Sequence, residues 1–280
     1  MQLRNQVASH AQFATGSDGS RLPHFPGAGM VPRMLRFSAS MLSLTLFALL
    51  TGCTTPPVSV GKKISTTRDT WGHRAGARGF STVVLDAGHG GRDAGATSRS
   101  TGQKEKDLTL DMVQRVQREL RGSVRTVLTR NSDRFVELDD RVRIANATND
   151  AVLVSIHFNS GRSNLAGPEV FYWRVDSYTL GRRVQTALSG TTQEKHASRG
   201  LVRRRLRLTR NPKIASVLVE CGYLSHASEA RLISKPEYRT RLAKAIAGAI
   251  LEQRAEGDAG LGPLPGPIYA PPSKGTDPRE

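Results

Sequence analysis

Short apolar runs alternate with helical patterns from residue 82 to residue 252 of the chain. The most continuous apolar runs lie at residues 82–86, 151–157 and 216–220. Runs of this kind are typical of parallel strands that are covered on both faces. One helical pattern, at residues 105–120, has its apolar stripe at Leu108, Met112, Val116 and Leu120. The alternation predicts an α/β fold with a single open, mostly parallel twisted sheet and helices on both faces.

The remaining elements are predicted from the same patterns. We expect further strands at residues 124–128 and 169–175 and an edge strand at 205–209. Further helices are expected at residues 138–147, 178–188, 227–233 and 237–252. The segment between Arg78 and Gln253 has roughly 175 residues, which is enough to bury one hydrophobic core. The two cysteines of the chain, Cys53 and Cys221, provide no disulfide framework.

Four residues with metal-binding or acid–base side chains stand at the ends of these elements. His89, His157 and Glu220 follow or end the three most continuous apolar runs. Because ligands bind beyond the carboxyl ends of the strands in open α/β sheets, we expect these three side chains at one edge. Glu105 opens the first helix on the same stripe as Leu108 and therefore faces inward. A carboxylate in that place is costly unless it is paired or bound to a metal.

The four side chains are of the types that a zinc hydrolase needs. Two histidines and one carboxylate are the usual ligands of a catalytic zinc ion that keeps one position open for water. A further carboxylate beside such a site serves as a general base. We therefore hypothesise metal-assisted hydrolysis with one Zn²⁺ ion as the cofactor.

Each of these residues also has a structural explanation when it is taken alone. His89 could belong to a glycine turn, His157 could be a satisfied core histidine, and Glu220 could pair with an arginine. Glu105 could be a first-turn acid that the helix dipole favours. Chance placement of all four at one edge is the weaker explanation. A phosphate loop at GHGG is disfavoured because Asp93 stands where the G-x-G-x-x-G pattern needs glycine.

Three neighbouring residues could also take part in the site. Asp86 and Asp93 are close enough in the sequence to His89 to support its ring or to form the turn, and turn formation is the favoured interpretation. Cys221 follows Glu220, but strand alternation turns its side chain to the opposite face of the sheet. We therefore do not expect a thiol nucleophile.

The N-terminal part has the features of an export signal. Residues 34–50 are mostly apolar and follow Arg33, and the sequence LTGC stands at residues 50–53. A basic start, an apolar stretch and small residues are typical of a secretory signal, and the run is shorter than the ~20 apolar residues of a membrane-spanning helix. The LTGC ending resembles the lipobox of bacterial lipoproteins, which implies that Cys53 is the lipidated first residue of the mature protein. An uncleaved anchor and a plain signal peptide are the alternatives.

Four segments are expected along the chain. Residues 1–52 form an N-terminal extension and lipoprotein signal peptide that is removed. Residues 53–79 are polar and contain Pro and Gly, which predicts a flexible tether. Residues 80–254 form the catalytic domain. Residues 255–280 are rich in Pro and Gly and are expected to be disordered.

The formal net charge of the chain is +17 at pH 7. Such an excess favours a polyanionic surface or substrate. For an exported protein, a cell-wall polymer with peptide carboxylates or anionic lipid headgroups fits better than nucleic acid. The basic run Arg203, Arg204 and Arg205 has few aromatic residues within it to stack on bases, so we expect no nucleic-acid partner. A basic surface that only aids solubility is the simpler alternative.

Several separated blocks, in the correct order, strongly resemble the zinc-dependent N-acetylmuramoyl-L-alanine amidases of the type 3 family. The blocks are VVLDAGHGGRDAGA, EKDLTLDMV, VLTRNSDRFVELDDRVRIAN, SIHFNS and ASVLVECGYLSH. The resemblance runs from about residue 82 to residue 250, which is most of the expected mature chain. Position by position, the resemblance implies that His89, Glu105 and His157 are the zinc ligands. Glu220 matches the catalytic glutamate of the family.

The chain departs from the family pattern in two places. Tyr223 and His226 stand where Phe and Asn are usual, and we expect neither to touch the chemistry. Gated family members insert an inhibitory helix in the region of residues 160–212, but this stretch is short and shows no pattern of an extra helix, which implies a site that is constitutively open. An activator protein that the sequence does not identify is a further partner to consider.

The reaction that the resemblance implies is hydrolysis of the amide between N-acetylmuramic acid and L-alanine in peptidoglycan. It would serve cell-wall remodelling, daughter-cell separation or recycling. The implied place is the cell envelope, facing the periplasm, with a membrane anchor through Cys53. Thr54 in place of Asp favours the outer over the inner membrane. A non-catalytic peptidoglycan-binding lipoprotein and another envelope zinc peptidase are the alternatives.

Overall fold

The computed structural model describes residues 67–69, 72–191, 200–266 and 268–270. The predicted signal segment and Cys53 lie outside these residues and stay predictions. Within the described ranges, no helix combines the length and the hydropathy that a membrane span requires.

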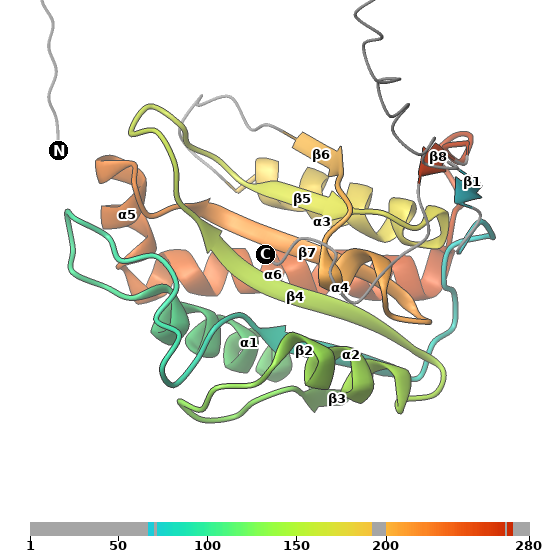
Figure 1. The fold of residues 1–280 in the computed structure, drawn as a ribbon, viewed down its shortest axis with the longest axis horizontal. Helices are drawn as coiled ribbons and strands as arrows, with labels where there is room; N and C mark the ends of the chain where they lie inside the picture. The colour runs from blue at the N-terminus through green and yellow to red at the C-terminus, as the bar shows by residue number, and fades with distance from the viewer. Residues whose placement is uncertain (1–66, 70–71, 192–199, 267, 271–280) are drawn as a thin grey trace, which may run out of the picture. The chain divides into compact units, whose positions relative to one another are not determined.

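A six-stranded sheet in the order β3-β2-β4-β7-β5-β6 forms the centre of the domain (Figure 1). Its strands are β2 (Thr82–Ala87), β3 (Arg125–Leu128), β4 (Ala151–Asn159), β5 (Glu169–Tyr172), β6 (Gly200–Arg203) and β7 (Ala215–Tyr223). All neighbouring strands are parallel except β5 and β7, which are antiparallel. The open, mostly parallel sheet confirms the predicted fold class.

Helices cover both faces of this sheet (Figure 1). One face is covered by α1 (Glu105–Leu120), α3 (Tyr178–Ser189) and α6 (Pro236–Glu256). The other face carries α2 (Leu138–Asn146) and the short α4 (Arg207–Arg210). The helix α5 (Ala227–Ile233) follows β7 along the chain.

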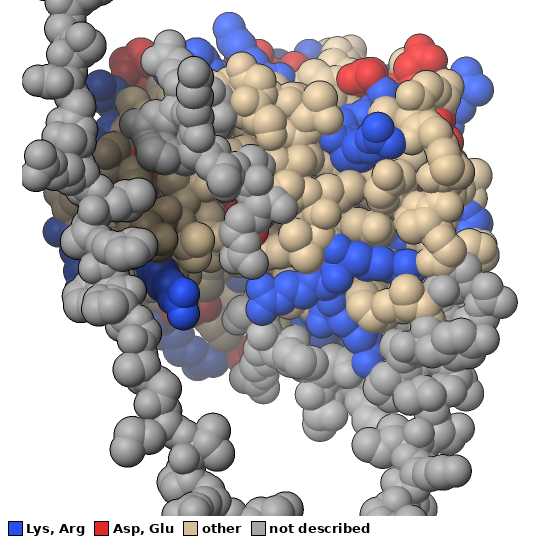
Figure 2. All heavy atoms as spheres, turned by 90° about the horizontal axis from the view of Figure 1, so that it is seen from above, with Lys and Arg blue, Asp and Glu red and all other residues tan. Residues whose placement is uncertain are grey.

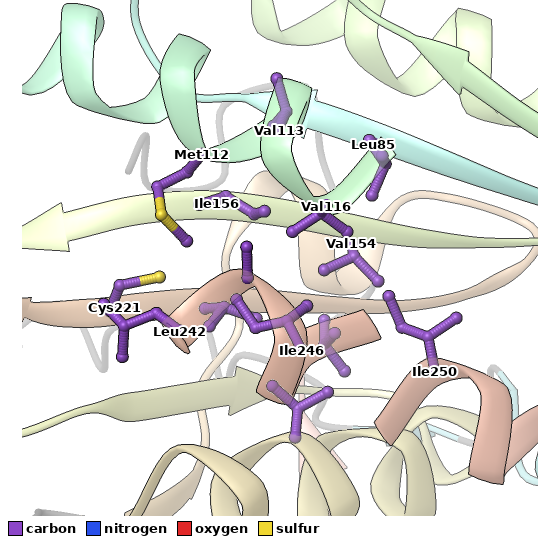
Figure 3. Packing of buried hydrophobic residues seen from close by; sticks show 14 of the residues in the cluster. Leu85, Met112, Val113, Val116, Val154, Ile156, Cys221, Leu242, Ile246 and Ile250 are labelled. Atoms are coloured by element: carbon purple, nitrogen blue, oxygen red, sulfur yellow. The ribbon is translucent and has the colours of Figure 1, made fainter. Parts of the chain in front are cut away.

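The main core lies between the sheet and the helices α1, α3 and α6. The predicted stripe of α1, which includes Met112 and Val116, is fully buried. Figure 3 shows Met112 and Val116 beside Ile156 of β4, with Leu242 and Ile246 of α6 on the neighbouring side of the cluster. The apolar period in the sequence of α1 is therefore used to bury one helix face, which positions Glu105 at the start of that helix.

The predicted edge strand at 205–209 is wrong. The edge strand is β6, which ends at Arg203, and the next residues turn into α4. The hydroxyl of Thr209 accepts a hydrogen bond from the backbone N–H of Leu206 (3.0 Å) and donates one to the carbonyl of Arg204 (2.7 Å). This local bonding favours a helical turn over a strand, and it sends the side chains of Leu206 and Leu208 into two different apolar clusters.

The strands that carry the candidate site are longer than predicted. β4 continues to Asn159 and β7 to Tyr223, so His157 and Glu220 lie inside their strands rather than at the last residue. In contrast, β5 ends at Tyr172 and is followed by a 3-10 turn at Val175–Ser177.

Contacts of the described chain continue on both sides of residues 80 and 254, the expected limits of the catalytic domain. The backbone N–H of Gly76 donates to both carboxylate oxygens of Asp258 (2.9 and 3.1 Å), and Thr179 of α3 donates to the same carboxylate (2.7 Å). Arg78 donates to the carbonyl of Ala255 (2.9 Å). Beyond them, β1 (Thr67–Asp69) pairs with β8 (Ile268–Ala270) in a second, two-stranded sheet that was not predicted. The described parts of the expected tether and tail are thus packed on the domain and on each other.

Arginines at the β6 edge stack on aromatic side chains. Arg204 lies over the ring of Phe171 (5.3 Å), and Arg203 and Arg205 lie over Trp173 (5.6 and 5.8 Å). Figure 2 shows a band of Lys and Arg side chains on one face of the molecule, as the net charge leads one to expect. Phe171 and Trp173 are themselves buried. Their rings are therefore not available to stack on bases, as a single-strand nucleic-acid platform would require.

Candidate active site

His89 lies in the loop that follows β2, where the backbone turns sharply. Its φ angle is 59°, in the left-handed region, and Gly90 and Gly91 also have positive φ angles. A left-handed residue other than glycine costs about 1–3 kcal/mol and persists only where the surroundings hold it. Nδ1 of His89 lies 2.9 Å from Oδ2 of Asp93, whose Oδ1 accepts from the N–H of Gly95 (3.1 Å). Asp93 therefore forms the turn, as expected, and also orients the imidazole.

Glu105 is the first residue of α1 and is almost completely buried. Its Oε1 lies 3.0 Å from Nε2 of His89 and 3.0 Å from Nδ1 of His157. Backbone N–H groups of Phe158 and Ala96 donate to its two oxygens (3.1 and 2.9 Å). Burial by itself would raise the pKa of Glu105, but the hydrogen bonds and charges of the two histidines lower it well below its usual range. The carboxylate is therefore ionised in the neutral pH range.

Glu220 stands beside His157 on the neighbouring strand. The two residues are register partners of the parallel pair β4–β7, so their side chains project from the same face of the sheet. His157 is buried, whereas Glu220 is the one partly exposed residue of β7. The site thus combines a buried histidine with a partly exposed glutamate.

Cys221 points to the opposite face of the sheet, as predicted from strand alternation. Its side chain is fully buried in the core near Leu242 and Met112 (Figure 3). Burial raises the pKa of this thiol well above its usual value. It is protonated and inaccessible, in agreement with the prediction that it is no nucleophile.

The side chains of His89, Glu105 and His157 can hold one metal ion. One ligand atom from each lies within 4.8 Å of the others. A tetrahedral zinc ion with bond lengths near 2.1 Å separates its ligand atoms by about 3.4 Å. The two 3.0 Å contacts of Glu105 are close to that spacing. Two imidazoles and one carboxylate are also the donor set that zinc prefers, so the residues fit the ion.

Two glycines support the site through their lack of a side chain. A Cβ atom at Gly88 would lie 2.2 Å from Cε1 of His157, and one at Gly95 would lie 2.7 Å from Oε2 of Glu105. The close approach of Gly88 to a ring from another strand has no signal in a single sequence.

Asp86 lies beneath the site and does not form the turn that was favoured for it. It is fully buried in β2 and accepts hydrogen bonds from Arg141 (2.7 Å), Ser155 (2.6 Å) and Thr129 (2.5 Å). Burial alone would raise the pKa of Asp86, but the charge of Arg141 and these hydrogen bonds lower it overall. This charge is therefore compensated inside the protein and is not directed at His89.

A cavity of about 440 Å³ opens beside His89 and His157. Residues 135–141 form one wall, and Arg207 of α4 contributes to the lining. Arg207 forms an ion pair with Asp139 across this wall. The cavity is large enough for a part of a substrate to reach the two histidines. The contribution of Arg207 was missed because its segment was expected to be a strand.

The chain matches the model of the N-acetylmuramoyl-L-alanine amidase family (Amidase_3) over residues 83–252. The protein belongs to this family. The match covers more than half of the chain and includes all four candidate residues. Membership of this family confirms the predicted enzyme class, an N-acetylmuramoyl-L-alanine amidase that acts on peptidoglycan.

Individual relatives of the amidase agree with this assignment. LytH of Staphylococcus aureus, named a probable cell wall amidase, is 35% identical over 169 residues, which are 59% of this chain and 55% of LytH. The chain thus matches only about half the length of LytH. The amidase AmiC2 of Nostoc punctiforme is 37% identical, with a TM-score of 0.58 over 63% of this chain and 98% of AmiC2. The CwlD amidase of Clostridioides difficile, solved in complex with the GerS lipoprotein, is 29% identical, with a TM-score of 0.58 over 61% and 97%.

The structure describes only part of residues 160–212, the stretch in which no inhibitory helix is expected. Residues 192–199 lie outside the described part of the chain. In the rest of this stretch the helices are the turn Val175–Ser177, α3 and α4. Of these three helices, α3 packs on α6 at the main core. Only α4 contributes a residue, Arg207, to the lining of the cavity.

Proposed function

We propose that this amidase uses one zinc ion to hydrolyse the amide between N-acetylmuramic acid and L-alanine of peptidoglycan. In this proposal His89, Glu105 and His157 hold the ion, and Glu220 is the general base. The observation that carries it is the position of Glu105 Oε1, 3.0 Å from a nitrogen of each histidine. Glu220 projects next to His157 without belonging to that ligand group.

The bound zinc ion supplies Lewis acidity towards a water molecule and towards the scissile carbonyl. Glu220 takes a proton from the attacking water on a carboxylate oxygen and passes it to the nitrogen of the leaving L-alanine. The C–N bond breaks as the new C–O bond is completed, so the products are a lactyl carboxylate and a free amine. Glu220 is partly exposed, as a base that meets a substrate has to be.

Asp93 and Glu105 prepare the histidines for the ion. When Nδ1 of His89 donates its hydrogen to Asp93, the lone pair of Nε2 is left for the metal. A carboxylate partner of this kind also raises the basicity of a ligand imidazole. Glu105, held by the N–H groups of Phe158 and Ala96, keeps its charge at the point where the two rings meet.

The direct test is mass spectrometry of peptidoglycan digested by the purified mature protein, with and without a chelator. We expect peptides with a free N-terminal L-alanine and glycans with a free lactyl carboxylate, and loss of both after chelation. Cleavage between two amino acids would instead identify an envelope zinc peptidase. Binding to peptidoglycan without any cleavage would identify a non-catalytic wall-binding protein.

Gly88→Ala is expected to weaken zinc binding by about tenfold or more. The added methyl group overlaps the ring of His157, with 2.2 Å to Cε1 and 2.4 Å to Nε2, so the imidazole has to move. The zinc dissociation constant is measured by competition with a chromophoric chelator. Gly248→Ala on α6 is the matched control, because nothing lies within 4 Å of its added Cβ. Equal zinc affinity in Gly88→Ala and wild type would contradict the role of His157.

The membrane attachment is a separate proposal that rests on the LTGC sequence before Cys53. Cys53→Ser removes the sulfur needed for acylation, and each buried CH₂ of an acyl chain contributes ~0.8 kcal/mol to anchoring. We expect the variant in the soluble envelope fraction or as an unprocessed precursor, whereas the purified catalytic domain keeps its rate. Wild-type protein in the soluble fraction with a mature N-terminus other than Cys53 would indicate a plain signal peptide.

The physiological partners are also part of this proposal. We place the enzyme in the cell envelope, facing the periplasm and attached to the outer membrane. CwlD was solved in complex with the GerS lipoprotein, which supports the proposal of an activator protein for this chain. The rate of the purified enzyme, measured with and without an envelope extract, tests it.

A further inference from the structure

We infer that Arg130 and Arg141 are positioning residues for the metal site: they hold the backbone that carries His89 and Glu105, and thereby set the affinity for zinc. The inference rests on the proposed function, because it assumes that these residues hold the ion. Neither arginine belongs to the group of ligand atoms. Both side chains are buried, with 1% and 2% of their surface exposed.

Arg141 reaches the loop of His89 from α2, on the face of the sheet opposite to α1, α3 and α6. Its Nη2 donates to the carbonyl of His89 (2.8 Å), and its Nη1 donates to the carbonyl of Ala87 (2.5 Å). The same Nη1 also contacts Asp86 (2.7 Å), and Nε donates to the carbonyl of Val136 (3.1 Å). One guanidinium group therefore spans the residue before the loop and the proposed ligand itself.

Arg130 connects the loop of His89 to the start of α1. Its Nε donates to the carbonyl of Ala87 (2.9 Å). Its Nη2 lies 2.8 Å from the carbonyl of Gly88 and 2.7 Å from the carbonyl of Lys106. Gly88 directly precedes His89, and Lys106 directly follows Glu105. Arg130 thus links the backbones on which two of the three proposed ligands stand.

The loop needs such support because its conformation is unfavourable by itself. His89 has a φ angle of 59°, where side chains other than glycine are strained. Three successive carbonyls, from Ala87 to His89, each accept at least one of the arginine hydrogen bonds. A planar guanidinium has five N–H groups in a fixed fork, whereas a lysine has three on one atom and cannot span the same carbonyls. Lysine at these positions is therefore expected to keep a charge and to lose the geometry.

The chain contains a matched control at the other end of the sheet. Arg174 is also buried (1% exposed) and pairs with Asp176 (2.9 Å). It donates to the carbonyls of Pro212 (2.5 Å) and Lys213 (3.1 Å), which precede β7. It repeats the chemistry of Arg141 and Asp86 away from the metal site. Its replacement should affect stability alone.

The test compares Arg130→Lys, Arg141→Lys and Arg174→Lys in the purified mature protein. Two quantities are measured: the melting temperature without metal, and the zinc dissociation constant by chelator competition in folded protein. We expect all three variants to have a lower melting temperature than the wild type. Only Arg130→Lys and Arg141→Lys should bind zinc about tenfold or more weakly. Equal zinc affinity in these two variants and in Arg174→Lys would overturn the inference.

A milder variant keeps the test decisive if the arginine variants fail to fold. The hydroxyl of Thr109 donates to the carbonyl of Gly88 (2.7 Å) and lies 3.0 Å from Nη2 of Arg130. Thr109→Val keeps the shape and removes this part of the support, so we expect zinc binding to weaken several-fold. Wild-type affinity in Thr109→Val would then overturn the inference. If the wild-type protein itself binds no zinc, the proposed function fails instead, and the two failures are distinct.

Discussion

Glu220→Gln is expected to reduce the rate of amide hydrolysis by about 10²- to 10⁴-fold and to leave zinc bound. The substitution keeps the size of the side chain but removes the negative charge and the basicity with which the carboxylate accepts a proton from water. The proposed ligands His89, Glu105 and His157 are unchanged, since Glu220 is not among the atoms that converge within 4.8 Å. The loss should appear in kcat, because proton transfer is part of the chemical step.

The measurement combines the release of stem peptides from peptidoglycan with metal analysis of the same sample. Glu119→Gln is the matched control, because Glu119 is an exposed residue of α1 and the chemical change is the same. Its rate and zinc content should equal those of the wild type. Loss of zinc in Glu220→Gln would reassign Glu220 as a ligand, and a wild-type rate would remove it from the mechanism.

Glu105→Ala is expected to abolish both zinc binding at micromolar protein and the activity. It removes the oxygen that lies 3.0 Å from a nitrogen of each histidine and leaves two neutral ligands, which do not hold a zinc ion tightly. It also removes the acceptor for the N–H groups of Phe158 and Ala96. His89→Ala and His157→Ala should each lower zinc content and rate in the same direction.

Zinc content is determined by metal analysis after gel filtration, and circular dichroism checks that the variants are folded. Glu119→Ala serves as the control for a glutamate of the same helix outside the site. Full zinc content together with the full rate in any one of the three ligand variants would return that residue to a structural role. Addition of excess zinc should not restore the rate of Glu105→Ala.

The predicted site depended on strand ends, and the structure explains why His157 and Glu220 lie side by side although those ends differ from the prediction. His157 and Glu220 lie two and three residues before the ends of their strands, yet they are register partners on neighbouring strands. Parallel pairing places residues of the same register side by side, so an error in the strand length leaves their relation unchanged. The start of α1 at Glu105 was also predicted correctly, because its apolar stripe is regular.

The differences from the prediction have two sources, one local turn that was taken for a strand and one set of contacts between segments far apart in the sequence. Leu206 and Leu208 alternate with polar residues as in a strand, but hydrogen bonds of Thr209 favour the turn of α4. Gly76 and Asp258, which lie outside the expected limits of 80 and 254, are joined by a contact between segments 182 positions apart. Local propensity contains no information on such contacts.

The sequence by itself determined the fold class, the family and the four residues of the candidate site. Apolar periodicity specifies which faces are buried, and the order of strands and helices restricts how they connect. Only the tertiary structure decided how the ligands are held. His89 has a left-handed backbone that the surrounding structure has to hold. Gly88 approaches His157 closely, and two buried arginines donate to the loop carbonyls, so these contacts join segments that are distant in the chain. Their hydrogen bonds and packing exist only after the core has brought these segments together, because each alone would be solvated by water.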